Sequence, residues 1–214
     1  MRAFASPSWS EPAGPFSLFN QSLSGILAVM RLPTPTPPPA NLAGSLLLAH
    51  PTLRDPNFRR TVVLMSVHTE EGAMGVVLNR PLNKRLGEIN GSYAYGPLAD
   101  VPVFSGGPVQ LDQLILVAWQ RHTEGFRLHF GVEFDHAKEL MSDESTSIRA
   151  YVGYSGWEGG QLEGELRNNA WVVSPMMPDL LDRSPTEDLW RLVLGGISPE
   201  WKLLAGEPDD LSFN

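Results

Sequence analysis

The sequence contains no cysteine. This absence excludes disulfide bonds, thiolate nucleophiles and thiolate metal ligands from the chemistry of the chain. It fits a reducing compartment, and we expect a cytoplasmic protein. The sequence also lacks an uninterrupted apolar run of about 18–20 residues, the length that a membrane-spanning helix needs. We therefore expect no insertion into a membrane.

Basic residues are also few. The chain has 16 Lys and Arg against 24 Asp and Glu, which gives a formal net charge of −8 at pH 7. Proteins that bind nucleic acids normally present a basic face to the phosphates. We therefore expect no direct contact with nucleic acid, and the acidity suits a protein or small-molecule partner better. The basic residues Arg54, Arg59 and Arg60 are interpreted as part of a solvated turn.

The first 40 residues differ from the rest of the chain in their proline content. They end in a proline-dense run at residues 33–39, which favours extended polyproline II structure and cannot enter a helix or a central strand. We predict a disordered tail over residues 1–40 and a single domain over residues 41–214. Met30 is a second candidate start site, so residues 1–29 need not belong to the natural protein.

Short apolar and β-branched segments separated by turn residues predict a sheet. The segments 61–68 and 75–79 are joined by a link that contains Glu71-Gly72, which indicates an antiparallel hairpin. The predicted strands occupy residues 44–49, 61–68, 75–79, 103–105, 114–119, 126–130, 147–152 and 170–173. Because helical segments are interspersed among them, the pattern predicts a mixed α/β (α+β) fold in which helices flank a twisted mixed β-sheet.

Capping residues and prolines mark where the helices should begin. The predicted helical segments are a turn at residues 56–59 after Asp55, a short helix at 84–89, a helix from Asp135 to Met141, one after the turn at residues 153–157, and one that begins at Ser184-Pro185 and stops at Gly195-Gly196.

The glycine-rich segment Gly153-Tyr154-Ser155-Gly156-Trp157 is the most distinctive motif. A hydrolase nucleophile elbow needs the pattern Gly-x-Ser-x-Gly, and Trp157 stands where its second glycine should be. Ser155 and Glu158 instead have the spacing of a capping box. We therefore predict a turn from a strand into a helix, in which the Ser155 hydroxyl caps the helix.

Three polar segments are candidates for one binding site. His50 follows a buried strand, Arg80 follows Asn79 at the end of another, and the loop Ser105-Gly106-Gly107-Pro108 could offer backbone amides to an anion. Each segment also has a structural interpretation. His50 could be a hydrogen-bonded structural histidine, Arg80 could form an ion pair, and the loop at residues 105–108 could be a tight glycine turn.

The histidines do not predict a metal site. His122, His129 and His136 recur every seven residues, but Gly125 and Gly131 break any single helix that would align them. The sequence also has no His-Glu-x-x-His motif. We expect no metal and no cofactor.

Taken in order, five motifs resemble the AlgH/YqgE family of bacterial proteins. The resemblance covers about residues 42–194, and the motifs lie at 44–51, at 55–64, at 72–81, at 104–109 and at 153–163, where Gly153–Trp157 is followed by Gly159-Gly160-Gln161-Leu162-Glu163. It implies a cytoplasmic α/β protein with a mixed, twisted sheet. The family name implies a regulatory role in alginate production, and no catalytic mechanism comes with it.

Two functions therefore remain open at this stage. The first is a regulatory, ligand-binding or protein-binding domain without catalysis. The alternative is an enzyme or a nucleotide- or anion-binding protein with a pocket around His50, Arg80 and the loop 105–108, in which His50 would transfer a proton. The candidate ligand-binding residues are His50, Asn79, Arg80, Ser105, Gly106, Gly107, Tyr154, Trp157 and Gln161.

Overall fold

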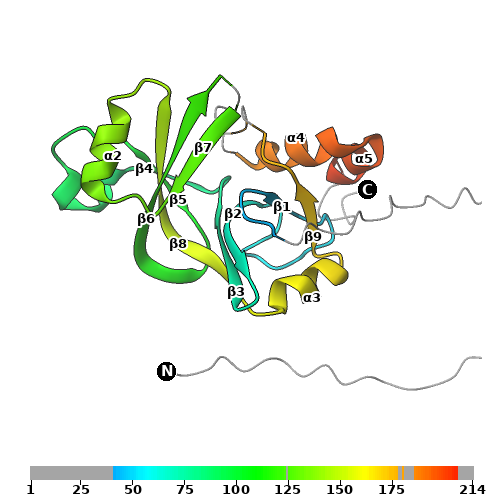
Figure 1. The fold of residues 1–214 in the computed structure, drawn as a ribbon. Helices are drawn as coiled ribbons and strands as arrows, with labels where there is room; N and C mark the ends of the chain where they lie inside the picture. Colours follow the sequence, from blue (N-terminus) through cyan, green and yellow to red (C-terminus); the bar gives the residue numbers. More distant parts are fainter. Residues whose placement is uncertain (1–40, 124, 178–179, 181–185, 207–214) are drawn as a thin grey trace, which may run out of the picture. The chain divides into compact units, whose positions relative to one another are not determined.

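A sheet of nine strands runs through the described part of the protein (Figure 1). The structure is a computed structural model that describes residues 41–123, 125–177, 180 and 186–206. The predicted tail and the predicted helix start at Ser184-Pro185 lie outside these residues. The division of the chain into a tail and a single domain therefore stays a prediction.

The strands pair in the order β4-β5-β8-β3-β2-β1-β9, and β6 pairs with both β7 and β8. The pair β5–β8 is parallel and the other pairs are antiparallel, which confirms the predicted mixed sheet. The predicted hairpin is β2–β3. The strands are β1 (Leu46–Ala49), β2 (Val62–Thr69), β3 (Gly72–Val77), β4 (Pro81–Arg85), β5 (Pro102–Ser105), β6 (Val109–His122), β7 (Gly125–Phe130), β8 (Thr146–Glu158) and β9 (Trp171–Ser174).

The helices lie outside the sheet. They are α1 (Leu86–Ile89), α2 (Phe134–Met141), α3 (Gln161–Arg167), α4 (Glu187–Ile197) and α5 (Pro199–Gly206), with a 3-10 turn at Gly91–Tyr93. Among the residues described, none of the helices combines the length and apolar character needed to cross a membrane.

Three boundaries of the predicted helices at 84–89, 135–141 and 184–196 are wrong. Helix α1 begins at Leu86 rather than at residue 84, because Lys84 and Arg85 pair with β5. The N-cap of α2 is Glu133 rather than Asp135, which lies within the first turn. Helix α4 continues through Gly195-Gly196 to Ile197. A Cβ atom on Gly195 would lie 3.4 Å from the Cα of Lys202, so this glycine allows α4 and α5 to pack closely instead of ending the helix.

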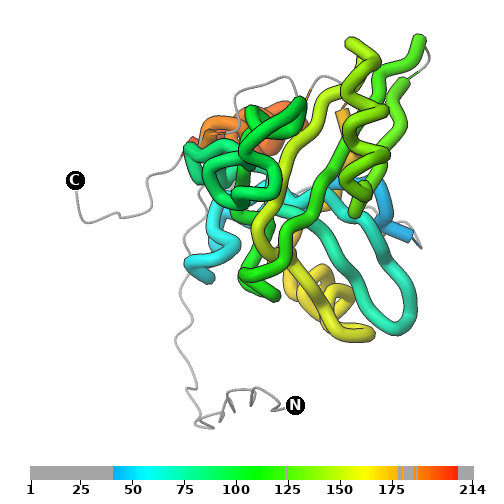
Figure 2. The backbone as a smooth tube through the Cα atoms, turned by 90° about the vertical axis from the view of Figure 1, so that its left-hand side faces the viewer, coloured from blue at the N-terminus to red at the C-terminus, as the bar shows by residue number. Residues whose placement is uncertain are grey.

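Strand β8 connects the two halves of the sheet and runs from the end that carries α2 to the end that carries α3 (Figure 2). Its first half, up to Val152, lies between β5 and β6, whereas Ser155–Glu158 pair with β3. The change of neighbours occurs at Gly153, whose φ of 69° is readily adopted by glycine.

The predicted turn with a Ser155 cap is therefore wrong, because residues 153–157 are part of β8. Ser155 is fully buried opposite Gly75, and its hydroxyl donates to the carbonyl of Gly106 at 3.1 Å. Helix α3 begins only after Gly160, a left-handed residue. The serine–glutamate spacing is equally compatible with an extended strand, and pairing with β3 decides the structure.

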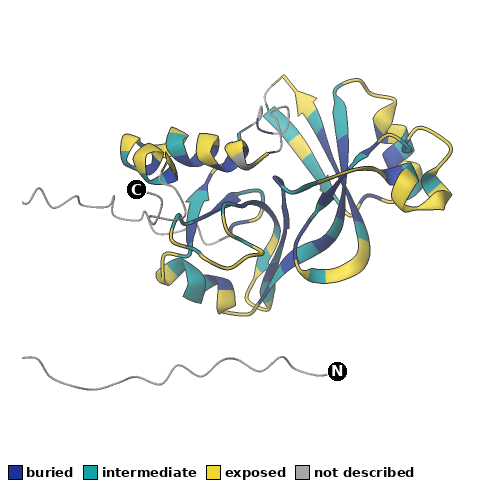
Figure 3. Cartoon of the chain, turned by 180° about the vertical axis from the view of Figure 1, so that it is seen from behind, coloured by how far each residue is buried: buried dark blue, intermediate teal, exposed yellow. Residues whose placement is uncertain are grey.

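Alternating side chains of β1 and β2 build two layers of core. Leu46 and Leu48 pack in the cluster that contains residues of α4 and α5, and Leu47 packs in the cluster that contains Leu162 of α3. These central strands are buried on both faces, while the helices expose their outer sides (Figure 3). The apolar runs of the sequence follow from this double burial.

Candidate functional site

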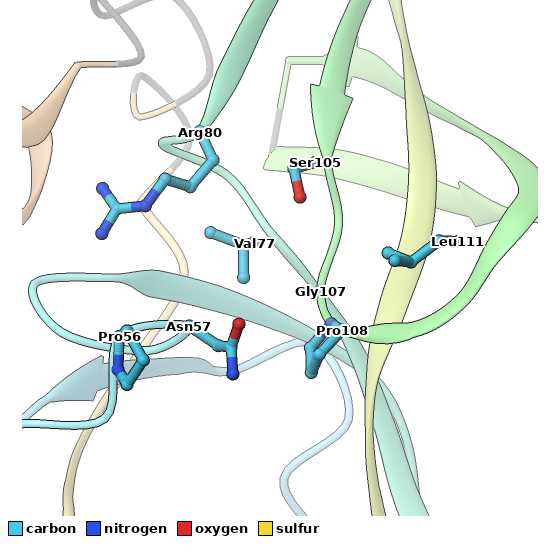
Figure 4. A pocket seen from close by; sticks show the side chains of 8 residues that line it. All are labelled: Pro56, Asn57, Val77, Arg80, Ser105, Gly107, Pro108 and Leu111. Carbon is cyan, nitrogen blue, oxygen red and sulfur yellow. The ribbon is translucent and has the colours of Figure 1, made fainter.

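A pocket of about 260 Å³ opens where three segments of the chain meet (Figure 4). The segments are the turn at residues 55–60, the end of β3 with the residues that follow it, and the end of β5 with the loop into β6. The lining residues are Pro56, Asn57, Val77, Arg80, Ser105, Gly107, Pro108 and Leu111. The predicted site residues Arg80, Ser105 and Gly107 are therefore brought together.

The turn at residues 55–60 is built by Asp55. Its carboxylate accepts hydrogen bonds from the backbone amides of Asn57 at 2.8 Å and Phe58 at 3.3 Å, and the Arg59 amide donates to its carbonyl at 2.7 Å. This is the single helical turn that the sequence predicts. It places Pro56 and Asn57 on the wall of the pocket.

Aromatic packing fixes this turn to the sheet. The ring of Phe58 stacks on Trp157 with centroids 6.1 Å apart and meets Trp171 edge-on at 5.4 Å. Glu165 of α3 accepts the indole N–H groups of both tryptophans on the same oxygen, Oε2, at 2.9 and 2.7 Å. The side chain of Gln161 donates to the other oxygen at 3.0 Å. Trp157 and Gln161 therefore support the pocket from behind and do not line it.

Arg80 is the charged residue among the described residues of the pocket wall. Its Nη2 donates to the backbone carbonyl of Arg59 at 2.5 Å, which orients the guanidinium group. Its side chain extends from the end of β3 toward the turn that carries Pro56 (Figure 4). A guanidinium group presents five N–H donors in a planar fork that matches a carboxylate or a phosphate.

Asn79 has a structural role beside Arg80. Its side chain is buried, and its Oδ1 accepts from the Val62 amide while its Nδ2 donates to the Arg60 carbonyl, both at 2.9 Å. These bonds join the start of β2 to the turn at residues 55–60. Asn79 thus fixes the backbone from which Arg80 projects, and its amide does not reach the pocket.

The loop after β5 does not offer all the amides that the sequence suggested. The Ser105 amide donates to the carbonyl of Arg80 and the Gly106 amide donates to Val152, both at 2.9 Å. A Cβ on Gly106 would lie 2.2 Å from the carbonyl oxygen of Gly153, and one on Gly107 would lie 2.3 Å from the backbone of Tyr154. Both glycines thus allow β8 to approach, while the Ser105 hydroxyl points toward the pocket (Figure 4).

His50 does not line the pocket. Its Nδ1 lies 2.7 Å from the Thr52 hydroxyl, and its ring meets the indole of Trp201 edge-on with centroids 5.4 Å apart. Burial lowers the pKa of His50 below its ordinary value of 6.5. Tyr154, another candidate, packs against the core cluster of β1 and α4. His50 therefore has the structural role that was its alternative in the sequence, and Tyr154 contributes to the core.

Several lining residues were not among the candidates. Pro56 and Asn57 belong to a motif that supports the family resemblance, so a signal for them existed. Leu111 had none, because it lies in the register shift between Val109 and Leu114 of β6. Within the described residues, no group of three or more His, Asp or Glu side chains could hold a metal ion.

Comparison with known proteins confirms the family resemblance. The AlgH-like family model matches residues 46–202. A UPF0301 protein of Streptomyces coelicolor is 40% identical over 188 residues, which cover 82% of this chain and 96% of that protein. A UPF0301 protein of Mycobacterium tuberculosis is 36% identical over 182 residues, which cover 80% of this chain and 90% of that protein.

Solved structures have the same fold. The solution structure of the AlgH protein from Pseudomonas aeruginosa matches with a TM-score of 0.59 and 28% identity, over 83% of this chain and 100% of that one. The crystal structure of DIP2367 from Corynebacterium diphtheriae matches with a TM-score of 0.65 and 22% identity, over 81% and 95% of the two chains. The match of the family model and the identity to the curated relatives show that the chain belongs to the AlgH-like family, UPF0301.

Proposed function

We propose that this protein is a small-molecule-binding protein that holds its ligand in the pocket between residues 55–60, Arg80 and the loop after β5, without a chemical step. The observation that supports it is the composition of the wall. Of the eight lining residues, all in the described part of the chain, none is Asp, Glu, His, Lys or Cys. A guanidinium group has donors but no acceptor, and Ser105 has no base beside it among these residues. The described part of the wall can therefore bind and orient a ligand, and none of its described side chains would exchange a proton with it.

The placement of His50 supports binding over catalysis. An enzyme at this site would need a proton-transfer group, and His50 was the candidate for that role. Its ring instead contacts Thr52 and Trp201. A binding role needs only the rigid wall that the aromatic cluster behind Phe58 provides.

We assign this binding a regulatory role in the cytoplasm. The family resemblance, the absence of cysteine and the acidic net charge support that role. A ligand in the pocket would contact the turn at residues 55–60 and the ends of β3 and β5 together. Its occupancy could therefore stiffen segments that are distant in the sequence, which is one way to signal to a partner.

The test is an unbiased metabolite screen on the full chain by thermal shift, with hits mapped by NMR to backbone amides. We expect a hit that raises the melting temperature, perturbs the amides of Asn57, Ser105 and Gly107, and is recovered chemically unchanged after incubation. Conversion of a pocket ligand into a product would overturn the non-catalytic proposal. Complete absence of a ligand at these amides would overturn the binding function itself.

A further inference from the structure

His68 has a hydrogen bond at each nitrogen of its ring. Its Nδ1 accepts from the backbone amide of Leu42 at 3.1 Å, and its Nε2 lies 2.8 Å from Oε1 of Glu163 in the first turn of α3. The side chain of His68 is only 10% exposed, so water has little access to these bonds. One imidazole therefore joins three parts of the chain, which are residues 41–44, β2 and α3.

The two partners determine which nitrogen of His68 carries the hydrogen. A backbone N–H can only donate, so Nδ1 must be the unprotonated nitrogen that accepts from Leu42. The hydrogen of the neutral ring then lies on Nε2, which donates it to the carboxylate of Glu163. The neutral Nε2–H tautomer is therefore the form of His68 that satisfies both bonds.

A second proton on the ring would break one of these bonds and keep the other. It would bind to Nδ1 and place an N–H group opposite the N–H group of Leu42, and neither group can accept. The bond to Glu163 would gain charge, because an imidazolium donates to the carboxylate as well. Protonation would thus keep His68 on α3 and release the amide of Leu42.

The charged groups that face His68 come from α3. Glu163 contacts the ring, and Arg167 lies one turn further along the helix and acts on Glu163. A hydrogen bond from its own backbone and the bond from His68 lower the pKa of Glu163 below 4.5. The carboxylate therefore stays charged between pH 8 and pH 5.

The other segments beside His68 contribute no charge of their own. Neither β3, which places Ala73 opposite His68, nor residues 41–44 contain an ionisable side chain. Glu70 and Glu71 are exposed in the turn that joins β2 to β3. A response of this contact to pH would therefore depend on His68 and its partner on α3.

The released amide would belong to a core residue. The side chain of Leu42 is fully buried in the cluster that contains Trp157 and Trp171. Phe58, from the turn at residues 55–60, packs against the same cluster. The bond from Leu42 to His68 thus fixes the backbone of a residue in the cluster that supports this turn.

We propose that His68 is a pH-sensitive latch for residues 41–44. The neutral ring holds the amide of Leu42 on β2. The protonated ring releases that amide, while Glu163 retains the ring on α3. This role goes beyond ligand binding in the pocket and does not depend on it.

NMR spectroscopy of the full chain between pH 8 and pH 5 tests the latch. The ¹⁵N shifts of the imidazole report the tautomer of His68, and amide hydrogen exchange, corrected for its intrinsic dependence on pH, reports the protection of Leu42. We expect the Nε2–H tautomer at pH 8. As the ring titrates, the protection of Leu42 should fall about tenfold or more, with the same midpoint, because one hydrogen bond is lost.

Two variants and one control identify the group that responds. His68→Gln has an acceptor and a donor but does not titrate, so the response of Leu42 to pH should vanish. Glu163→Gln keeps an acceptor without the charge that favours the imidazolium, so the response should move to lower pH. This variant also provides a second measurement if His68→Gln does not fold. Glu144→Gln, at an exposed glutamate in the turn before β8, should respond like the natural protein.

Three results in the natural protein would overturn the latch. They are an Nδ1–H tautomer at pH 8, a ring that stays neutral down to pH 5, and protection of Leu42 that is unchanged while the ring titrates. A response of Leu42 that persists in His68→Gln, or that keeps its midpoint in Glu163→Gln, would overturn it as well. None of these measurements uses a ligand, so failure of the latch would leave the proposed binding function standing.

Discussion

The ring of Phe58 stacks on the ring of Trp157 at an interplanar angle of 24°. Phe58 lies in the turn that forms one wall of the pocket, and Trp157 lies in the half of β8 that pairs with β3. The pocket wall is thus held by a strand that does not line the pocket. Substitutions behind the wall should therefore change stability, whereas substitutions on the wall should change binding.

Glu165→Ala should lower the free energy of unfolding by about 2–3 kcal/mol, because the indole N–H groups of Trp157 and Trp171 both lose their acceptor and each unsatisfied buried donor costs about 1–3 kcal/mol. Both indoles belong to residues at most 6% exposed. Urea denaturation measures the change. Glu144→Ala, at an exposed glutamate, is the control and should shift stability by no more than about 0.5 kcal/mol. Equal losses in the two variants would show that the carboxylate of Glu165 does not hold the indoles.

Gly107→Ala should destabilise the protein by about 3 kcal/mol or more or prevent folding, since the new Cβ would lie 2.3 Å from the backbone of Tyr154. Gly125→Ala is the matched control. Gly125 has a φ of 140°, close to the 148° of Gly107, but nothing lies within 4 Å of its Cβ position. The control should therefore show only backbone strain of about 1–3 kcal/mol. Thermal unfolding compares the two, and a Gly107→Ala variant as stable as Gly125→Ala would contradict the close approach.

Asn79→Ala should cost about 2–3 kcal/mol of unfolding free energy, because it leaves the Val62 amide and the Arg60 carbonyl without their side-chain partner. The control is Asn168→Ala, at an exposed asparagine, with an expected change of about 0.5 kcal/mol or less. Denaturation of both variants gives the comparison. If Asn79→Ala kept full stability but lost ligand binding, the structural role of Asn79 would be wrong.

Replacement of His50 should change how stability depends on pH. Burial lowers the pKa of His50 in the folded protein below 6.5, so below about pH 6.5 the unfolded chain takes up a proton that the folded protein resists. This contribution reduces stability as the pH falls through 6.5 and disappears at higher pH. His50→Asn should therefore lose less stability than the natural protein between pH 7.5 and pH 5.5, measured by denaturation at both values.

The local sequence pattern was sufficient to predict many of the strands in the sheet. The apolar segments in β1 and β2 predicted strands because burial on both faces leaves few polar positions. The local sequence pattern gave a wrong prediction at Ser155, because hydrogen bonding to a distant strand determines the conformation there. A capping-box spacing covers only four residues, and it contains no information about β3.

The candidate site was predictable to the extent that it lies at strand ends. Arg80 and Ser105 follow or end strands that glycine and proline mark in the sequence, and the structure brings them together. His50 also follows a strand, but β1 lies beside β2 and β9 rather than beside β5. The order of the strands decides which ends share a pocket, and that order depends on long-range pairing that no short segment encodes.

The long strand β8 has a consequence for how the protein unfolds. Its two halves have different neighbours: residues up to Val152 pair with β5 and β6, residues from Ser155 pair with β3, and Tyr154 between them pairs with Val109 of β6. If β8 separated from its neighbours in one region, the other region would lose a central strand as well. The two regions should therefore open together, and amide hydrogen exchange in β3 and in β6 should report one common opening free energy rather than two. Because one continuous strand belongs to both regions of the sheet, we expect the two regions to unfold as a single cooperative unit.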